Sequence, residues 1–388
     1  MTYATRRIFD ADSHIMETAD WLASYADPAI RGRLRPYTTN ATELLEHLDE
    51  ALQLHARRQS DPDLLARAED QVLIDKGWLS LGAFDPKERS RALDLLGFEQ
   101  QLVFASFSLA QFFNHRDLDV VYGGATAHNR GMAEFCATDP RLLAVGYVPM
   151  EVPERAAATA EEAVSLGCRA LHVKSHPSGS LSPSHPEFDR LWAVCQEAGV
   201  AVVAHLGGGN LPDGRRPLPE VFENNGKPPG SGFLGGEGMK ALDYLATPHP
   251  VELFVGALVL DGVLERFPRL RVGVIEQGAM WLVPWMRRLD LAQKIFRKGQ
   301  PYLELPMSAS EYVRRQVRTT PFPREPVGWI IDQVGDEIVM FSSDYPHPEG
   351  GKDPVALWEG TFDGLSEESL EKFYWRNCAD MLGLSVAA

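Results

Sequence analysis

The stretch Ile8-Phe9-Asp10-Ala11-Asp12-Ser13-His14, close to the N-terminus, places acidic and imidazole side chains at the end of a short apolar run. Its first two residues favour a β-strand, and side chains along a strand alternate between its two faces. We therefore expect Asp10, Asp12 and His14 to point to one side of the strand end. A carboxylate and an imidazole two residues apart are suitable ligands for a divalent metal ion. The alternative is a strand end followed by a helix that Asp12 or Ser13 caps.

The overall composition favours a small molecule as the partner. The chain has 388 residues, and its 38 lysines and arginines against 54 aspartates and glutamates give a formal net charge of −16. This charge argues against a nucleic acid or an anionic membrane as partner. No apolar run is long enough to cross a bilayer and no signal-peptide core is present, so we expect a cytoplasmic protein. The four cysteines are scattered without a C-x-x-C pair and are expected in the core: Cys136, Cys168, Cys195 and Cys378.

Expected strands and helices alternate along most of the chain, a pattern typical of parallel sheets with crossover helices. The count of eight strands favours an α/β fold of the (β/α)8 TIM-barrel type over an open sheet. We expect a single domain over residues 1–388. The expected strands are the opening stretch and residues 102–105, 142–148, 169–173, 200–204, 270–275, 317–319 and 338–341.

Two segments interrupt this alternation. Residues 17–91 have a helical pattern with little strand signal, and we expect them to form a helical cap after the first strand. Residues 206–238 are rich in glycine and proline, and we expect a loop over the active site. Each segment follows a strand that ends in a candidate ligand, so both are expected to cover the site and to set substrate specificity.

Polar side chains stand at the carboxyl ends of four expected strands, which is the end of such a barrel where chemistry takes place. They are Asp12 and His14 on the first strand, His205 on the fifth, Glu276 on the sixth and Asp344 on the eighth. Each has an ordinary explanation: His205 as a core histidine, Glu276 as a group that binds backbone amides of the next helix, Asp344 as a turn residue. Their joint placement in one barrel predicts a metal centre instead.

At these positions the chain resembles the amidohydrolase superfamily, in the amidohydrolase-2 branch, the aminocarboxymuconate semialdehyde decarboxylase-like TIM-barrel metal-dependent hydrolases. The resemblance covers nearly the whole chain and rests on residues 10–14, 203–205, 267–272, 275–281 and 342–347, in family order. It implies that Asp12, His14, His205 and Asp344 hold one divalent ion, either zinc, manganese or iron. No organic cofactor is expected, and the family's usual state suggests a homodimer.

The chain departs from this branch at the sixth strand. Decarboxylases of the branch hold a histidine there that serves as acid and base, whereas this chain has Glu276. A carboxylate that takes a proton from metal-bound water favours hydrolysis. We therefore expect a metal-dependent hydrolase of a small amide, ester, thioester or lactone, with Glu276 and Asp344 as catalytic residues. The alternatives are non-oxidative decarboxylation of an aromatic or unsaturated carboxylic acid and a non-catalytic binding protein.

Several other side chains are candidates for substrate binding. Strand alternation places His172, Lys174 and His176 on one side of the segment that follows the fourth strand. Some relatives with two metals use a carboxylated lysine after this strand, which is an alternative for Lys174. Trp78 and Phe107 are expected to line an apolar pocket, with core packing as the alternative for either ring.

Two further histidines lie in proline-rich segments. His347 follows Pro346, and we expect it to contact a metal ligand rather than to bind the metal itself. His249 is an additional candidate for the site, without a predicted position.

Overall fold

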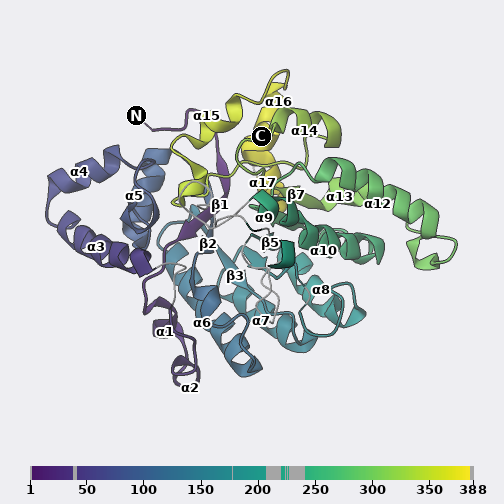
Figure 1. The fold of residues 1–388 in the computed structure, drawn as a ribbon, viewed down its shortest axis with the longest axis horizontal. Helices are drawn as coiled ribbons and strands as arrows, with labels where there is room; N and C mark the ends of the chain where they lie inside the picture. The colour runs from purple at the N-terminus through teal and green to yellow at the C-terminus, as the bar shows by residue number, and fades with distance from the viewer. Residues whose placement is uncertain are drawn as a thin grey trace.

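The computed structural model describes residues 2–37, 42–176, 178–206, 220–222, 224, 226 and 241–384. Seven strands form one parallel sheet in the order β1-β2-β3-β4-β5-β6-β7, so each strand pairs with the next along the chain. Helices surround this curled sheet, which confirms the predicted TIM-barrel fold (Figure 1). The strands are β1 (Phe9–Ile15), β2 (Gln100–Ala105), β3 (Leu142–Tyr147), β4 (Ala170–His172), β5 (Ala201–His205), β6 (Val272–Ile275) and β7 (Val317–Thr319).

Residues 338–345 bridge β7 to β1 without forming a regular strand, so the prediction of a complete eighth strand is wrong. Thr319 pairs with Val339, and Ser13 pairs with Tyr345, as isolated parallel bridges. A residue with positive φ close to the end of this segment interrupts its extended conformation. The segment nevertheless lies between the two edge strands and closes the ring.

Helices follow the strands in the order expected for this fold. Local signals set several of their ends: the Asp117 side chain accepts a hydrogen bond at the N-terminus of α6, and Gly199, with φ 66°, ends α8. The helices after β2 are α6 (Leu118–Cys136), α7 (Pro153–Ser165), α8 (Asp189–Ala198), α9 (Ala241–Ala246), α10 (Pro248–Leu260), α11 (Val263–Arg266), α12 (Leu282–Phe296), α13 (Ala309–Gln316), α14 (Val327–Val334), α15 (Pro354–Glu359), α16 (Glu367–Glu371) and α17 (Asn377–Met381).

The segment between β1 and β2 is helical, and Figure 1 shows α3, α4 and α5 as a lobe beside β1. A buried ion pair joins α3 to α5, with Arg58 Nη2 2.8 Å from Glu88 Oε2. The backbone N–H of Gly77 donates to Pro346 O at 2.9 Å, which fastens the lobe to the segment that closes the ring. The helices are α1 (Trp21–Tyr25), α2 (Pro28–Arg31), α3 (Thr42–Arg58), α4 (Pro62–Asp70), the 3-10 helix η1 (Gly77–Leu79) and α5 (Pro86–Leu96).

The role of this lobe as a cap over the site stays a prediction. The predicted active-site loop at 206–238 lies almost entirely outside the described residues, because only 206, 220–222, 224 and 226 belong to them.

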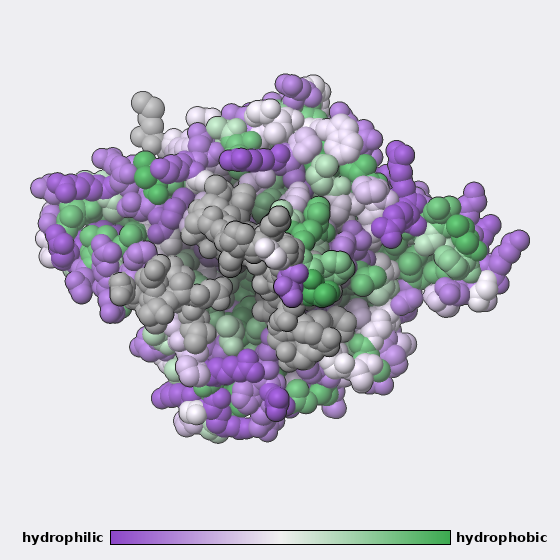
Figure 2. All heavy atoms as spheres, in the orientation of Figure 1, coloured by the Kyte–Doolittle hydropathy of each residue, from purple (hydrophilic) through white to green (hydrophobic). Residues whose placement is uncertain are grey.

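The strands are buried and the polar surface carries a few apolar patches. Every residue of β1 and of β5 is buried, and so are the four cysteines. Figure 2 shows apolar side chains on the surface over α10 and α12, where the exposed residues include Leu253, Leu291, Ile295 and Phe296. Among the described helices, none combines the length and the apolar character that crossing a membrane requires. The expected homodimer stays a prediction.

Candidate metal centre

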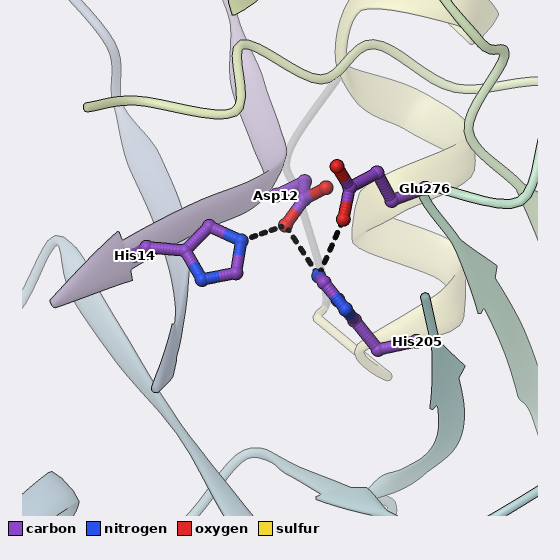
Figure 3. Close-up of side chains that lie close together, drawn as sticks. All are labelled: Asp12, His14, His205 and Glu276. Atoms are coloured by element: carbon purple, nitrogen blue, oxygen red, sulfur yellow. Dashed lines mark hydrogen bonds and ion pairs between the residues drawn. The ribbon is translucent and has the colours of Figure 1, made fainter. Parts of the chain in front are cut away.

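Four polar side chains meet where β1, β5 and β6 end (Figure 3). Asp12 Oδ1 lies 3.3 Å from Nε2 of His14 and 3.2 Å from Nε2 of His205. Glu276 Oε2 lies 3.5 Å from the same nitrogen of His205. One ligand atom from each of the four residues lies within 4.8 Å of the others. A parallel barrel gathers the carboxyl ends of its strands at one end, which explains how residues so far apart in sequence come together.

Asp344 borders this cluster from the segment that closes the ring. Its Oδ1 lies 3.4 Å from Nε2 of His14 and 3.1 Å from Nδ1 of His347. The His347 ring stacks on the His14 ring with centroids 3.9 Å apart, and its Nε2 lies 2.8 Å from Ser106 Oγ. Because His14 belongs to both groups, the predicted ligands and Glu276 adjoin one another. The assignment of four of them as ligands stays a prediction.

The backbone at two of these carboxylates is strained. Glu276 has φ 57° and Asp344 has φ 51°, in the left-handed region that non-glycine residues seldom adopt. Such a conformation costs on the order of 1–3 kcal/mol and is concentrated at functional sites. Thr320 Oγ1 accepts a 2.7 Å hydrogen bond from the Glu276 N–H, and Asp12 O accepts a 2.9 Å bond from the Asp344 N–H. These bonds hold the two carboxylates in place.

A contact of His205 with the backbone directs its other ring nitrogen into the cluster. Its Nδ1 lies 2.6 Å from the carbonyl oxygen of Leu206. Because a carbonyl oxygen only accepts, Nδ1 carries a proton, and Nε2 faces Asp12 and Glu276. Burial would lower the pKa of His205, but attraction to Asp12 and hydrogen bonds to Asp12 and Leu206 outweigh it and raise the pKa, so without a metal ion Nε2 can carry a proton towards Asp12. A bound metal ion would take the place of that proton. Metal-bound histidines usually donate from their other nitrogen in this way.

Buried atoms without hydrogen-bond partners mark the same place. Within the described part of the chain, Asp12 Oδ2, Asp344 Oδ2 and both ring nitrogens of His14 have no such partner. A buried polar atom left in this state costs roughly 1–3 kcal/mol. Carboxylate oxygens and imidazole nitrogens are together a suitable donor set for zinc, manganese or iron. The residues present therefore fit a divalent metal ion.

Burial and neighbouring charges adjust the acidity of these groups. Burial, assisted by His347, lowers the pKa of His14 to about 3, so its ring is neutral near pH 7. Burial would raise the pKa of Asp12, but attraction to His205 and the close approach of both histidines outweigh it and lower the pKa. Burial raises the pKa of Asp344 to about 6 against the opposing effect of His347. A neutral imidazole and an ionised carboxylate are the forms in which these side chains bind metals.

Asp10 does not join the cluster, although strand alternation placed it on the same side as Asp12. Its carboxylate accepts hydrogen bonds from Ser343 N at 2.8 Å, Ser343 Oγ at 2.6 Å and Gln101 Nε2 at 2.9 Å. The pairing of β1 with β2 shifts register between Asp10 and Ser13, which breaks the regular alternation. Asp10 thus connects β1 to β2 on one side and to the segment 338–345 on the other.

The backbone amides before α12 are bound by Glu325 and not by Glu276. On sequence grounds, this role was the alternative to metal chemistry for Glu276. Its Oε2 accepts hydrogen bonds from Ala279 N at 2.7 Å and from Phe322 N at 3.1 Å. Glu276 instead directs its carboxylate towards His205 (Figure 3). No local pattern indicates the role of Glu325, because it lies 46 residues from Ala279 in the sequence.

The candidate substrate residues His172, at the end of β4, and Lys174 and His176, which follow it, are buried, and their role in binding stays a prediction. The His172 ring centroid lies 6.2 Å from that of His205. The Lys174 ammonium lies 3.1 Å from Glu151 Oε1, so its charge is already paired. Burial lowers the pKa of His176 to about 4, and its ring nitrogens have no hydrogen-bond partner within the described ranges.

The two candidate aromatic residues stack on each other beside the site. The rings of Trp78 and Phe107 have centroids 5.0 Å apart, and Trp78 Nε1 donates to Glu17 O at 3.2 Å. They join η1 to the turn after β2, and a contact with substrate stays a prediction. His249 lies on the first turn of α10 with an exposed side chain and is outside both groups of clustered residues.

The sequence matches the family model described as Amidohydrolase over residues 10–384. The amidohydrolase map2389c of Mycobacterium avium subsp. paratuberculosis K-10 has a similar fold, with a TM-score of 0.71 and 21% identity, over 99% of this chain and 100% of that one. A dihydroxybenzoic acid decarboxylase from Polaromonas sp. JS666, solved with manganese and the inhibitor 2-nitroresorcinol, gives a TM-score of 0.63 and 18% identity, over 99% and 98%.

A curated relative bears on the reaction. The chain is 29% identical to the decarboxylase orsB of Emericella nidulans over 253 residues, which are 63% of this chain and 71% of the relative. Together with the decarboxylase structure, this relative overturns the prediction of a hydrolase. That prediction relied on Glu276 as an acceptor of a proton from water, but a carboxyl group can equally donate a proton to carbon. The match over nearly the entire length shows that the chain is an enzyme of the amidohydrolase superfamily and belongs to the amidohydrolase-2 family.

Proposed function

We propose that this protein is a manganese-dependent, non-oxidative decarboxylase of hydroxylated aromatic carboxylic acids. The observation that carries the proposal is the set of donor atoms of Asp12, His14 and His205, bordered by Asp344, which suits one divalent ion, with the Glu276 carboxylate beside it. The orsB decarboxylase supports the reaction, and the dihydroxybenzoic acid decarboxylase supports both the substrate class and manganese rather than zinc.

A small hollow lies beside the cluster. Its polar wall includes Asp12, Glu276 and Asp344, and its apolar wall includes Phe322 and Trp358. Aromatic side chains pack well against a planar ring, while the metal ligands stand where its carboxylate would bind. The substrate would therefore lie with its carboxylate towards the metal and its ring against the apolar wall.

Decarboxylation replaces a carbon–carbon bond by a carbon–hydrogen bond. An acid gives a proton to the ring carbon, the bond from that carbon to the carboxylate breaks, and carbon dioxide leaves. When bound, the metal ion would hold the carboxylate and a neighbouring ring oxygen and withdraw electron density from them. Ligand carboxylates must be ionised, so Asp344 as a ligand is a poor proton donor. We assign the proton donor to Glu276, which stands at the position of the acid and base in decarboxylases of the branch that this chain resembles.

The proposal is tested with a panel of dihydroxybenzoates. Metal-free protein is prepared with a chelator and reloaded with manganese or with zinc. We expect the manganese form to release carbon dioxide and the corresponding dihydroxybenzene in equal amounts, and the metal-free form to release neither. A manganese-loaded protein that leaves every dihydroxybenzoate of the panel unchanged would contradict the proposal.

A further inference from the structure

His347 follows the segment that closes the ring and contacts two of the predicted metal ligands. Its Nδ1 lies 3.1 Å from Asp344 Oδ1. Its ring stacks on the ring of His14, with centroids 3.9 Å apart and an angle of 21° between the two planes. One side chain therefore restricts the movement of two ligands, one from β1 and one from the closing segment.

The turn after β2 holds the His347 ring from its other edge. Ser106 Oγ lies 2.8 Å from His347 Nε2. The Ser106 N–H donates to Glu17 Oε2 at 3.0 Å. The next two residues, Phe107 and Ser108, donate their N–H groups to the same carboxylate at 3.1 and 3.0 Å. Glu17 is buried, so these three hydrogen bonds give the Ser106 hydroxyl a firmly held support.

The two ring nitrogens of His347 have different partners in this arrangement. An ionised carboxylate only accepts hydrogen bonds, so Nδ1 is favoured as a protonated nitrogen where it faces Asp344. A serine hydroxyl both donates and accepts, so Ser106 holds Nε2 whether or not that nitrogen carries a proton. The contact with Ser106 thus fixes the plane of the ring and directs Nδ1 towards Asp344.

We infer that His347 and Ser106 are positioning residues of the metal centre. His347 holds Asp344 and His14 in the orientation that binds the ion, and Ser106 holds His347. Both act on the ion through its ligands and do not bind it themselves. The inference rests on the divalent ion of the proposed function and adds the turn after β2 to the groups that support this ion. Removal of a group that orients metal ligands typically weakens metal binding about 10- to 100-fold.

A second serine–histidine pair lies on the same turn and provides matched controls. Ser108 Oγ lies 3.1 Å from His128 Nδ1, and both residues are buried. The His128 ring contacts the rings of Trp21 and Phe112 and belongs to neither group of clustered metal-binding side chains in the described ranges. Substitutions in this pair therefore disturb a buried contact of the same kind away from the predicted ligands.

The test measures the affinity of metal-free protein for manganese by calorimetry and the surroundings of the bound ion by electron paramagnetic resonance. His347→Phe keeps a ring against His14 and removes both nitrogens. We expect it to bind manganese about 10- to 100-fold more weakly, with an altered resonance spectrum. Ser106→Ala removes one hydrogen bond and should weaken binding about 3- to 10-fold. His128→Phe and Ser108→Ala should bind manganese within about threefold of the wild type, with an unchanged spectrum.

A partial rescue separates positioning from a general effect on folding. The amide nitrogen of an asparagine stands close to the position of Nδ1, so His347→Asn should bind manganese more tightly than His347→Phe. Wild-type affinity in His347→Phe, or an equal loss of affinity in His128→Phe, would overturn the inference. Loss of all manganese from both His347 variants would make His347 a ligand and would also overturn its positioning role. If His347→Phe does not fold, the comparison of Ser106→Ala with Ser108→Ala decides the question.

The inference and the proposed function fail separately. A wild-type protein that releases carbon dioxide from a dihydroxybenzoate, with His347→Phe binding manganese normally, contradicts the role of His347 alone. A wild-type protein whose manganese affinity depends on His347 and Ser106 and that releases no carbon dioxide contradicts the decarboxylase proposal alone.

Discussion

Glu325 Oε2 accepts a hydrogen bond from the backbone N–H of Ala279 at 2.7 Å, and this contact fixes the turn between Glu276 and α12. The same turn contains Gly278, which has φ 75°. A Cβ atom at this glycine would lie 2.7 Å from Glu325 Oε1, so the close approach requires glycine. The direction of the Glu276 carboxylate thus depends on a residue outside the metal centre.

Glu325→Gln should loosen this turn while the metal stays bound. The amide presents an NH2 group where backbone N–H donors converge, so the free energy of unfolding should fall by about 1–3 kcal/mol. The turnover number should fall as well, because Glu276 loses its fixed position. Denaturant unfolding, manganese content and turnover check this, with exposed Glu197→Gln as the control. Normal turnover in a destabilised Glu325→Gln protein would show that the turn does not position Glu276.

Glu276→Gln tests the proton donor directly. The substitution keeps the shape of the side chain and removes its acid, so turnover should fall by roughly 10²–10⁴-fold. Manganese content should stay close to that of the wild type. Loss of manganese would instead make Glu276 a ligand and would contradict its role as proton donor.

His205→Ala should remove most of the metal. Its Nε2 stands between Asp12 and Glu276, and its Nδ1 is held by the carbonyl of Leu206, so no nearby group replaces it. Elemental analysis of the purified protein measures the effect. His249→Ala, at an exposed histidine on α10, is the matched control and should keep its manganese. Full occupancy in His205→Ala would refute the predicted ligand set.

A histidine remote from the catalytic carboxylates should make stability depend on pH. Burial lowers the pKa of His128 to about 4, against an ordinary value of about 6.5 in the unfolded chain. Between these values the unfolded chain binds more protons, so the free energy of unfolding falls as pH falls from about 6.5 to 4. The full effect is about 3 kcal/mol.

Denaturant unfolding at several pH values checks this dependence. His128→Gln should show a weaker loss of stability on acidification than the wild type, whereas His47→Gln, at an exposed histidine, should follow the wild type. An identical pH dependence of stability in His128→Gln and wild type would mean that the titration of His128 does not cause the loss of stability in acid.

The sequence predicted those parts of the fold and the site that depend on local pattern. Alternating strands and helices indicated the barrel, and the strand ends indicated Asp12, His14 and His205, because a parallel barrel brings such ends together. The role of Asp10 was not predictable, since it depends on a register shift between β1 and β2. The same is true of Glu325, whose partners are distant in sequence.

The reaction was mispredicted for a different reason. Residue type alone does not show whether Glu276 takes a proton from water or gives one to carbon. The choice between hydrolysis and decarboxylation needed two further observations. They are the direction of the Glu276 carboxylate towards His205 and the decarboxylases among the relatives.

The most direct test of the proposed reaction follows the carboxyl carbon. Manganese-loaded wild type is incubated with 2,6-dihydroxybenzoate labelled with ¹³C in the carboxyl group, and the label is followed by NMR. The account predicts that the label leaves the aromatic acid and appears as carbon dioxide and bicarbonate, with an equal amount of resorcinol formed. A label that stays in the organic acid, both here and with every other carboxyl-labelled dihydroxybenzoate of the panel, after prolonged incubation with fully loaded protein would contradict it.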